Sequence, residues 1–278
     1  MKRDFTLNRF KELLYTLKRE GYAFRTFGEF ITSPEGKVAV LRHDVDRMPE
    51  NALETARLEK EAGIKGTYYF RTVPGRWYPG VIGKISEMGH ETGYHYETVD
   101  TAYRKKGGRL SLIKGGIISG DEREKLMDEA WAEFRRNLER MRQIAPVTTA
   151  AMHGSPFSPV SNLDLWEKYD YREAGIMGEP YKDVDFSRVL YLTDTGRRWD
   201  NPGIIVRDKV DGETDHLTLE VRTTGQLIEA VKNGKLPDRV MITIHPQRWT
   251  GSTAGWLREL VWQNIKNSIK RLIVLRSR

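Results

Sequence analysis

Two carboxylates at the end of an apolar segment are the first residues in this chain whose types and spacing suit catalysis. Asp44 and Asp46 follow residues 38–42, VAVLR, a β-branched and apolar run typical of a strand. Because side chains alternate along a strand, residues two apart project to the same side, so both carboxylates face one site. One of them can bind a cation while the other, free of metal, accepts a proton from water. Since Asp46 also precedes Pro49, helix capping is the alternative interpretation.

Three of the six histidines follow the same pattern, each at the end of a β-type segment. His95 ends ETGYH, His153 ends TTAAMH and His245 ends VMITIH. A lone histidine is more often a structural residue, and His90, directly after Gly89, is assigned to that class. Three buried imidazoles would each need a separate hydrogen-bond partner, whereas convergence on one metal ion accounts for all of them together.

The composition narrows the chemistry. Because the 278 residues include no cysteine, a disulfide framework, a thiolate nucleophile and a cysteine zinc site are excluded, and any metal must be held by His and carboxylates. The formal charge of +7 comes from scattered Lys and Arg, without a polybasic block or a nucleic-acid motif. We therefore expect no nucleic-acid partner, while an anionic substrate such as a nucleotide-linked or acidic sugar remains compatible with the charge.

The apolar segments also bear on location. None of them approaches the roughly 20 residues that a membrane-spanning helix needs. The first residues, MKRDFTLNRFKELL, turn polar and helical where a signal peptide would continue apolar. We expect a soluble, cytoplasmic protein without a membrane span.

Strands and helices alternate along the chain and must position these side chains. Strands are predicted at residues 38–42, 66–70, 91–95, 148–153, 174–177, 189–192 and 240–245, with a hairpin-like region at 204–221. Helices are predicted at about residues 6–21, 49–63, 81–88, 121–144, 226–233 and 256–272. A stretch rich in Gly, Lys and Arg, about residues 98–120, is expected to be an exposed insertion. The order predicts an α/β fold with a parallel sheet, closed or nearly closed as a barrel, in a single domain over residues 1–278.

The order of the motifs resembles a known family. Asp44-x-Asp46, then Gly-His-Glu-x-Gly-x-His over residues 89–95, then a late apolar strand ending in His245, is similar to the NodB-homology polysaccharide deacetylases, carbohydrate esterase family 4. The resemblance covers roughly residues 38–250 in motif order, and the seven-residue match is its most specific part. The chain looks like a divergent branch, similar to deacetylase-like proteins of surface-polysaccharide (O-antigen) biosynthesis.

The resemblance implies a fold, a cofactor and a reaction. The fold is a distorted (β/α)7 barrel of the NodB-homology type, and the cofactor is a divalent metal, a zinc-type ion, bound by one Asp and two His. The reaction is hydrolysis of an N-acetyl or related amide on a carbohydrate or sugar-nucleotide substrate. In the family pattern Asp44 is the general base, Asp46 and His95 are metal ligands, and His245 is the general acid.

Two departures from the family pattern concern the metal site. The family's second histidine ligand lies four residues after the first, where this chain has Val99. The family's Arg-x-Pro motif is replaced by Met-His-Gly-Ser-Pro, which puts His153 where an arginine is expected. Because catalytic zinc normally has three protein ligands, we expect His153 to take the vacated role, with Glu97 as the alternative ligand.

Further residues are expected to support the site or bind substrate. Asp194 is a candidate partner that holds the His245 imidazole charged, with a turn residue as the alternative interpretation. Trp249, and Arg197 with Trp199, are candidates for a sugar-binding wall, because aromatic faces pack against sugars and guanidinium groups bind anions. Packing in the core or at the rim is the alternative for these three residues.

The sequence therefore predicts a metal-dependent hydrolase that removes an N-acetyl or related N-acyl group from a sugar, in surface-polysaccharide or glycoconjugate biosynthesis. Two alternatives remain. One is a catalytically inactive carbohydrate-binding module on the same barrel, which lacks stoichiometric metal. The other is a metal hydrolase of small non-sugar amides, which a substrate panel would identify.

Overall fold

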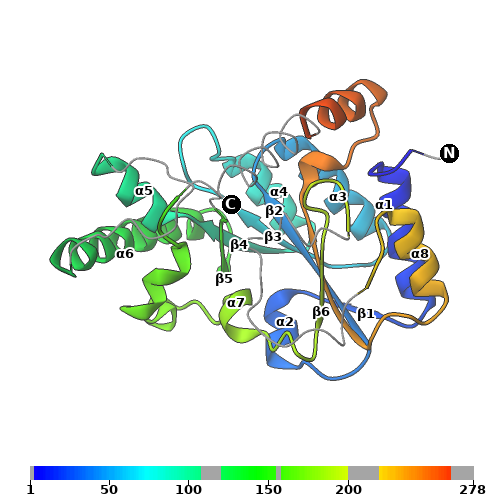
Figure 1. The fold of residues 1–278 in the computed structure, drawn as a ribbon, viewed down its shortest axis with the longest axis horizontal. Helices are drawn as coiled ribbons and strands as arrows, with labels where there is room; N and C mark the ends of the chain where they lie inside the picture. Colours follow the sequence, from blue (N-terminus) through cyan, green and yellow to red (C-terminus); the bar gives the residue numbers. More distant parts are fainter. Residues whose placement is uncertain (1–2, 108–119, 155–157, 200–218, 264–278) are drawn as a thin grey trace, which may run out of the picture.

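A parallel sheet forms the centre of the fold in the computed structural model, which describes residues 3–107, 120–154, 158–199 and 219–263 (Figure 1). Among these residues, one sheet contains β1 (Ala23–Arg25), β2 (Val38–Val45), β3 (Thr67–Phe70), β4 (Glu91–Tyr96), β5 (Val147–Met152), β6 (Leu190–Thr193) and β7 (Arg239–Ile244). The order is β5-β4-β3-β2-β7-β6, with β1 paired to β2 beside this path, and every pairing is parallel. The predicted α/β class, a distorted (β/α)7 arrangement, is confirmed, and over the described residues the sheet is open between β5 and β6.

Helices connect the strands and lie around the sheet (Figure 1). They are α1 (Leu7–Arg19), α2 (Phe27–Thr32), α3 (Pro49–Glu61), α4 (Pro79–Glu87), α5 (Thr98–Lys105), α6 (Gly120–Arg142), α7 (Pro180–Asp183) and α8 (Thr224–Lys232). Residues 253–263 are also helical, and they overlap the last helix predicted from the sequence. Among the helices described, none combines the length and the apolar character that crossing a bilayer requires.

Strand β2 lies inside the sheet and carries the first carboxylates. All eight of its residues are buried, as expected for a parallel strand covered on both faces. It pairs with β1 over residues 38–40, with β3 over residues 42–45 and with β7 over residues 38–43. Because neighbouring strands hold the carboxyl end of β2, the position of Asp44 is fixed by the register of the sheet.

Three apolar clusters hold the helices to the sheet. Helices α1 and α8 pack side by side (Figure 1) and bury their apolar faces against β2, β6 and β7. The α1 helix begins at Thr6, whose side chain accepts a hydrogen bond from the backbone N–H of Arg9, and α8 begins with a capping box between Thr223 and Gln226. A second cluster joins α3, α4, α5 and α6 to strands β3, β4 and β5. A third, smaller cluster packs α2 against β2, β3 and β7.

The strand predicted at residues 174–177 is wrong. Tyr171–Ala174 forms a 3₁₀ turn that ends at Gly175, whose φ of 70° lies in the left-handed region that favours glycine. The following segment pairs with β5 at an isolated bridge at Gly178 and forms no strand there. The apolar character of this segment reflects burial of Ile176 in the core.

The prediction of an exposed insertion at about residues 98–120 is wrong for residues 98–105, because they form a helix that packs on α6. The stretch expected as an exposed insertion begins with helix α5, whose Val99 and Ala102 are buried beside α6, and its residues 108–119 lie outside the described residues. Most of the predicted hairpin, residues 200–218, also lies outside them. The short elements β1 and α2 were not predicted, because three and six residues are too few to show a period.

Candidate metal centre

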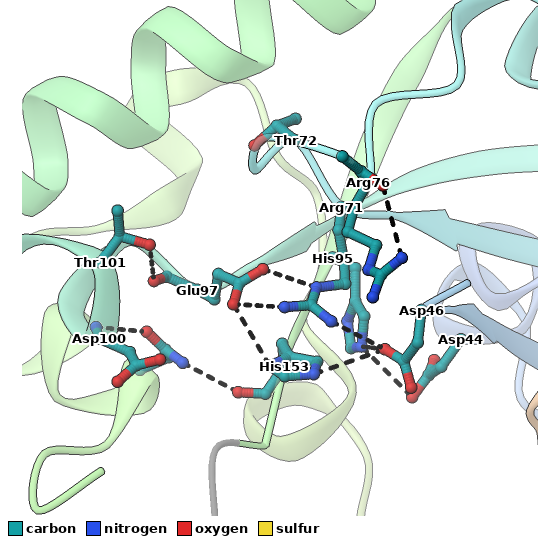
Figure 2. A network of polar contacts seen from close by, with 12 residues as sticks. Asp44, Asp46, Arg71, Thr72, Arg76, His95, Glu97, Asp100, Thr101 and His153 are labelled. Carbon is teal, nitrogen blue, oxygen red and sulfur yellow. Dashed lines mark hydrogen bonds and ion pairs between the residues drawn. The ribbon is translucent and has the colours of Figure 1, made fainter. Parts of the chain in front are cut away.

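Polar side chains from three strands meet at the carboxyl edge of the sheet (Figure 2). Asp44 is the last residue but one of β2, Asp46 follows that strand, His95 lies near the end of β4, and His153 directly follows β5. Parallel strands end at a common edge, so residues far apart in the sequence become neighbours there. His245, directly after β7, lies at the same edge.

Asp46, His95 and His153 each offer one ligand atom, and these atoms all lie within 4.8 Å of one another. Asp46 Oδ1 is 3.5 Å from His153 Nε2 and 3.8 Å from His95 Nε2. Ligands at about 2.0–2.1 Å from a tetrahedral zinc ion lie about 3.4 Å apart, so the observed separations fit a shared ion with small adjustments. One carboxylate and two imidazoles are also a ligand set of catalytic zinc.

Hydrogen bonds orient two of these three side chains, His95 and Asp46. His95 Nδ1 lies 2.9 Å from the carbonyl oxygen of Ala151, which leaves Nε2 directed at Asp46. Gln247 Nε2 donates to Asp46 Oδ2 at 3.2 Å, whereas Asp46 Oδ1 is buried without a hydrogen-bond partner among the described residues. A buried carboxylate oxygen that faces two imidazoles and lacks a donor is suited to a cation.

Burial and charge set the protonation of the site. Burial lowers the pKa of His95 to about 4, even against the opposing charge of Asp44. A neutral imidazole is the form that coordinates a metal. Burial raises the pKa of Asp46, but the charges of His153, His245 and His95 outweigh it and hold that pKa below its usual range. The residues of this centre therefore match a divalent ion in charge as well as in geometry.

Asp44 lies beside the group of Asp46, His95 and His153 but is engaged by Arg42. Arg42 donates from Nε and Nη2 to the two carboxylate oxygens, each at 2.9 Å, and both side chains are buried. Asp44 Oδ2 is 3.7 Å from His95 Nε2. Burial raises the pKa of Asp44, but Arg42, His95 and His245 lower it below its usual value. Asp44 is thus an ionised carboxylate held next to the centre by an arginine.

Glu97 forms an ion pair with Arg71 beside the group of Asp46, His95 and His153 (Figure 2). Arg71 donates from Nε and Nη2 to its carboxylate oxygens, each at 2.6 Å. Glu97 Oε2 lies 3.7 Å from His153 Nδ1, and Arg71 Nη1 lies 3.8 Å from Asp46 Oδ1. His153 and Glu97 were the two alternatives for the third ligand. His153 lies in the group with Asp46 and His95, whereas both carboxylate oxygens of Glu97 accept hydrogen bonds from Arg71.

His245 is held by Asp194. The imidazole Nδ1 lies 2.7 Å from Asp194 Oδ1, and the His245 backbone N–H donates to Oδ2 at 3.0 Å. Arg248 and the indole N–H of Trp249 also donate to this buried carboxylate. Burial raises the pKa of Asp194, but Arg248 and His245 bring it down to about 2. The carboxylate is therefore ionised, and it leaves Nε2 as the nitrogen of His245 that faces away from Asp194.

The residues expected to form a sugar-binding wall are buried. Trp249 and Trp199 have exposed fractions of 0% and 4%, and both rings pack with Phe5. The Arg197 guanidinium lies over the rings of Phe5 and Trp256. The packing alternative therefore describes these residues, because their faces are covered by the core.

Arg42, Arg71 and Gln247 were not selected from the sequence, although two of them follow a readable pattern. Arg42 precedes Asp44 by two residues in the alternation that places both carboxylates on one side, and Gln247 lies two residues after His245. Arg71 follows β3, which lies between β2 and β4 in the sheet. Its position at a strand end was the only feature of the sequence that could have indicated a place in the site. Each of the three contacts a site residue that was predicted from the sequence. The sequence interpretation therefore identified one residue of each contact and missed its partner.

Comparison with known proteins gave matches only among solved structures. No family model and no curated protein matches the chain. A mutant of BA3943, described as a CE4 family pseudoenzyme with restored enzymatic activity, has a TM-score of 0.41 and 15% identity, over 84% of this chain and 65% of that chain. A second mutant of BA3943, described as a CE4 family pseudoenzyme, has a TM-score of 0.41 and 15% identity, over 84% of this chain and 64% of that chain. Wild-type BA3943 from Bacillus anthracis, also described as a CE4 family pseudoenzyme, has a TM-score of 0.40 and 13% identity, over 84% of this chain and 62% of that chain. The chain thus spans less than two thirds of the length of these neighbours.

Proposed function

We propose that this chain is a metal-dependent hydrolase of the NodB-homology deacetylase type, which removes an N-acetyl or related N-acyl group from a sugar. The observation that carries the proposal is the grouping of Asp46, His95 and His153, with the carboxylate of Asp44, held by Arg42, beside them. The motif order Asp-x-Asp, Gly-His-Glu-x-Gly-x-His and a late strand-end histidine supports the deacetylase class. The surface-polysaccharide branch is part of the proposal and rests on the motif resemblance alone.

Asp46, His95 and His153 would hold a zinc-type ion. When bound, such an ion supplies Lewis acidity that activates water and polarises a carbonyl oxygen. The role of Asp46 Oδ1 is then that of a ligand, because Gln247 already occupies the other carboxylate oxygen. His95 is positioned for the same role by its contact with the carbonyl oxygen of Ala151.

Asp44 is the proton acceptor in this mechanism. Its carboxylate is ionised and held in one orientation by Arg42, and it lies 3.7 Å from a ligand nitrogen, so it borders the place where water would react. The bond between the carbonyl carbon and the amide nitrogen then breaks, and the leaving amine needs a proton. His245 supplies that proton from Nε2, because Asp194 binds Nδ1 and stabilises the imidazolium.

Metal analysis of the purified protein tests the ligand set. With zinc added and the excess removed, we expect about one ion per chain in the wild type, as catalytic zinc sites bind one. Asp46→Asn and His153→Ala should lose it, and the exposed control Glu54→Gln, which changes the same charge on helix α3, should retain it. Failure of the wild type to bind stoichiometric zinc would refute the proposed centre.

A substrate panel tests the reaction. N-acetyl sugars, sugar nucleotides and cyclic amides are incubated with the zinc-loaded protein, and released acetate or ring-opened product is measured. Hydrolysis of an N-acetyl sugar that disappears in Asp44→Asn supports the proposal. Cleavage confined to cyclic amides contradicts the sugar assignment. Sugar binding without stoichiometric metal and without hydrolysis favours the inactive carbohydrate-binding module.

A further inference from the structure

A cavity of about 340 Å³ opens directly beside Asp46 and is rich in arginine. It is lined by Asp46, Arg47, Arg71, Arg76, Gln247, Arg248, Glu259, Trp262 and Gln263. These residues come from the end of β2, the segment after β3, the turn after β7 and the helical residues 253–263. We call this space the arginine cavity. Its volume is at the lower end of ligand pockets, enough for one charged group and part of a sugar.

Three of the four arginines are already paired with carboxylates. Arg47 donates from Nη2 to both oxygens of Glu259, at 3.0 and 3.1 Å. Arg71 forms the bidentate pair with Glu97, and Arg248 contacts Asp194. These pairs hold the guanidinium groups in place and cancel their charge, so the cavity wall is preorganised.

Arg76 differs from the other three. Its only contact among the described hydrogen bonds and ion pairs is a bond of 3.5 Å from Nη1 to the carbonyl oxygen of Gly75 in the same turn. The side chain is half-buried and runs beside Arg71 toward the side of the site where Asp46 lies (Figure 2). Arg76 therefore presents a guanidinium group to the cavity without a carboxylate partner in the described parts of the chain.

The balance of charge points to an anionic ligand. Among the described contacts, Arg76 and Asp46 are the two charged groups of the cavity wall that have no hydrogen bond to an oppositely charged side chain. A divalent ion at Asp46 reverses the sign on that side, so the cavity then carries excess positive charge. Guanidinium groups bind phosphate and carboxylate oxygens with charge-assisted hydrogen bonds, and they do so better where water is partly excluded.

We propose that the arginine cavity binds an anionic group of the substrate, a phosphate or a carboxylate, through Arg76. The substrate of the metal centre is then a charged N-acyl sugar, with the oxyanion beside Arg76 and the amide at Asp44 and the metal ligands. This inference rests on the proposed function, since it places the reacting amide at that centre. A neutral polymer would leave Arg76 without a partner in this cavity.

The test compares charged and uncharged substrates in the zinc-loaded protein. The probes are N-acetylglucosamine 1-phosphate, N-acetylglucosaminuronic acid and the uncharged methyl N-acetylglucosaminide. The wild type should favour at least one anionic probe in kcat/KM, by roughly 10- to 100-fold over the uncharged one, the range expected for hydrogen bonds to a charged group. Comparing the 1-phosphate with the uronic acid shows whether the cavity prefers a phosphate or a carboxylate.

Arg76→Gln should reduce the ratio of kcat/KM for the anionic probe to kcat/KM for the uncharged probe to within about threefold of unity, mainly by raising KM for the anionic probe. Arg76→Lys should retain part of this preference. The matched control is Arg57→Gln, which removes the same charge from an exposed position on helix α3. Equal use of charged and uncharged probes by the wild type overturns the inference and leaves the proposed hydrolase intact.

Equilibrium binding separates this inference from the proposed function. Calorimetric titration with N-acetylglucosamine 1-phosphate, with zinc present, should show binding that Arg76→Gln weakens by at least about tenfold. If no amide is hydrolysed but this difference is seen, the anion site stands while the hydrolase proposal fails. If neither the phosphate nor the uronate binds more tightly than the uncharged sugar, the anion site fails.

Discussion

Arg42 and Asp44 lie two residues apart on strand β2 and are joined by two parallel hydrogen bonds of 2.9 Å. Both side chains are buried, and the Arg42 guanidinium also lies over the rings of Tyr69 and Tyr181. The pair keeps a carboxylate ionised and oriented beside Asp46 and His95. A side chain on the same strand thus sets the protonation of the proposed general base.

Removal of Arg42 should destabilise the fold. Arg42→Met leaves the Asp44 carboxylate buried and unpaired, and breaking a buried pair in this way costs about 3–5 kcal/mol of unfolding free energy. The double variant with Asp44→Asn should recover part of the loss, because the uncompensated charge is gone. Urea unfolding of the three proteins measures both effects, and a double variant no more stable than Arg42→Met would contradict the explanation.

Asp44→Asn should separate catalysis from metal binding. The substitution keeps the shape of the side chain but removes the proton acceptor, so we expect turnover to fall by about 10²- to 10⁴-fold. Zinc stoichiometry should stay at the wild-type level, because Asp44 is held by Arg42 and is outside the ligand group. Parallel metal analysis and acetate-release assays measure this, and turnover equal to that of the wild type would rule out the role.

Glu97→Gln should weaken zinc binding without abolishing it. Glu97 anchors Arg71 and lies beside His153 Nδ1, and loss of such a supporting group typically lowers metal affinity by about 10- to 100-fold. His153→Ala, which removes a proposed ligand, should lower it further. Competition with a chromogenic chelator ranks the variants. The reverse order would identify Glu97 as the ligand.

Asp194→Asn should destabilise the protein in a pH-dependent way. The folded pKa of Asp194, about 2, lies below its usual 3.8, so its ionised form stabilises the fold above pH 3.8 and this contribution is lost as the pH falls through 2. The shift corresponds to about 2 kcal/mol at neutral pH. Denaturant unfolding at pH 7 and at pH 2–4 should show the variant and the wild type converging in acid. The exposed control Asp128→Asn should behave like the wild type at pH 7.

Gly93→Ala tests the structural part of the Gly-His-Glu-x-Gly-x-His motif. A Cβ atom at this position would lie 2.4 Å from Tyr69 Cε1, in a buried strand where the ring has little room to move. We expect a loss of about 1–3 kcal/mol, the usual cost of overpacking. Thermal unfolding of Gly93→Ala, with Gly80→Ala as a control at an open glycine, measures it. Unchanged stability would show that the ring can shift.

The sequence predicted which residues would meet, because a parallel sheet leaves little freedom in where strand ends lie. Asp46, His95 and His153 each end an apolar segment, and once those segments form parallel strands their ends share one edge. The same logic could not predict the partners of these residues. The contact of Arg71 with Glu97 depends on side-chain directions after two different strands, which no spacing along the chain encodes.

Residue types and their periods, by themselves, determined the α/β class, the cysteine-free ligand set and the positions of Asp44, Asp46, His95, His153 and His245 at strand ends. Tertiary structure alone decided which side chain completes the group with Asp46, that Arg42 engages Asp44, and that Trp249 is buried with no exposed surface. The reason is physical. Periodicity follows from local backbone geometry and is written along the chain, whereas a buried contact depends on how neighbouring elements fill the space between them.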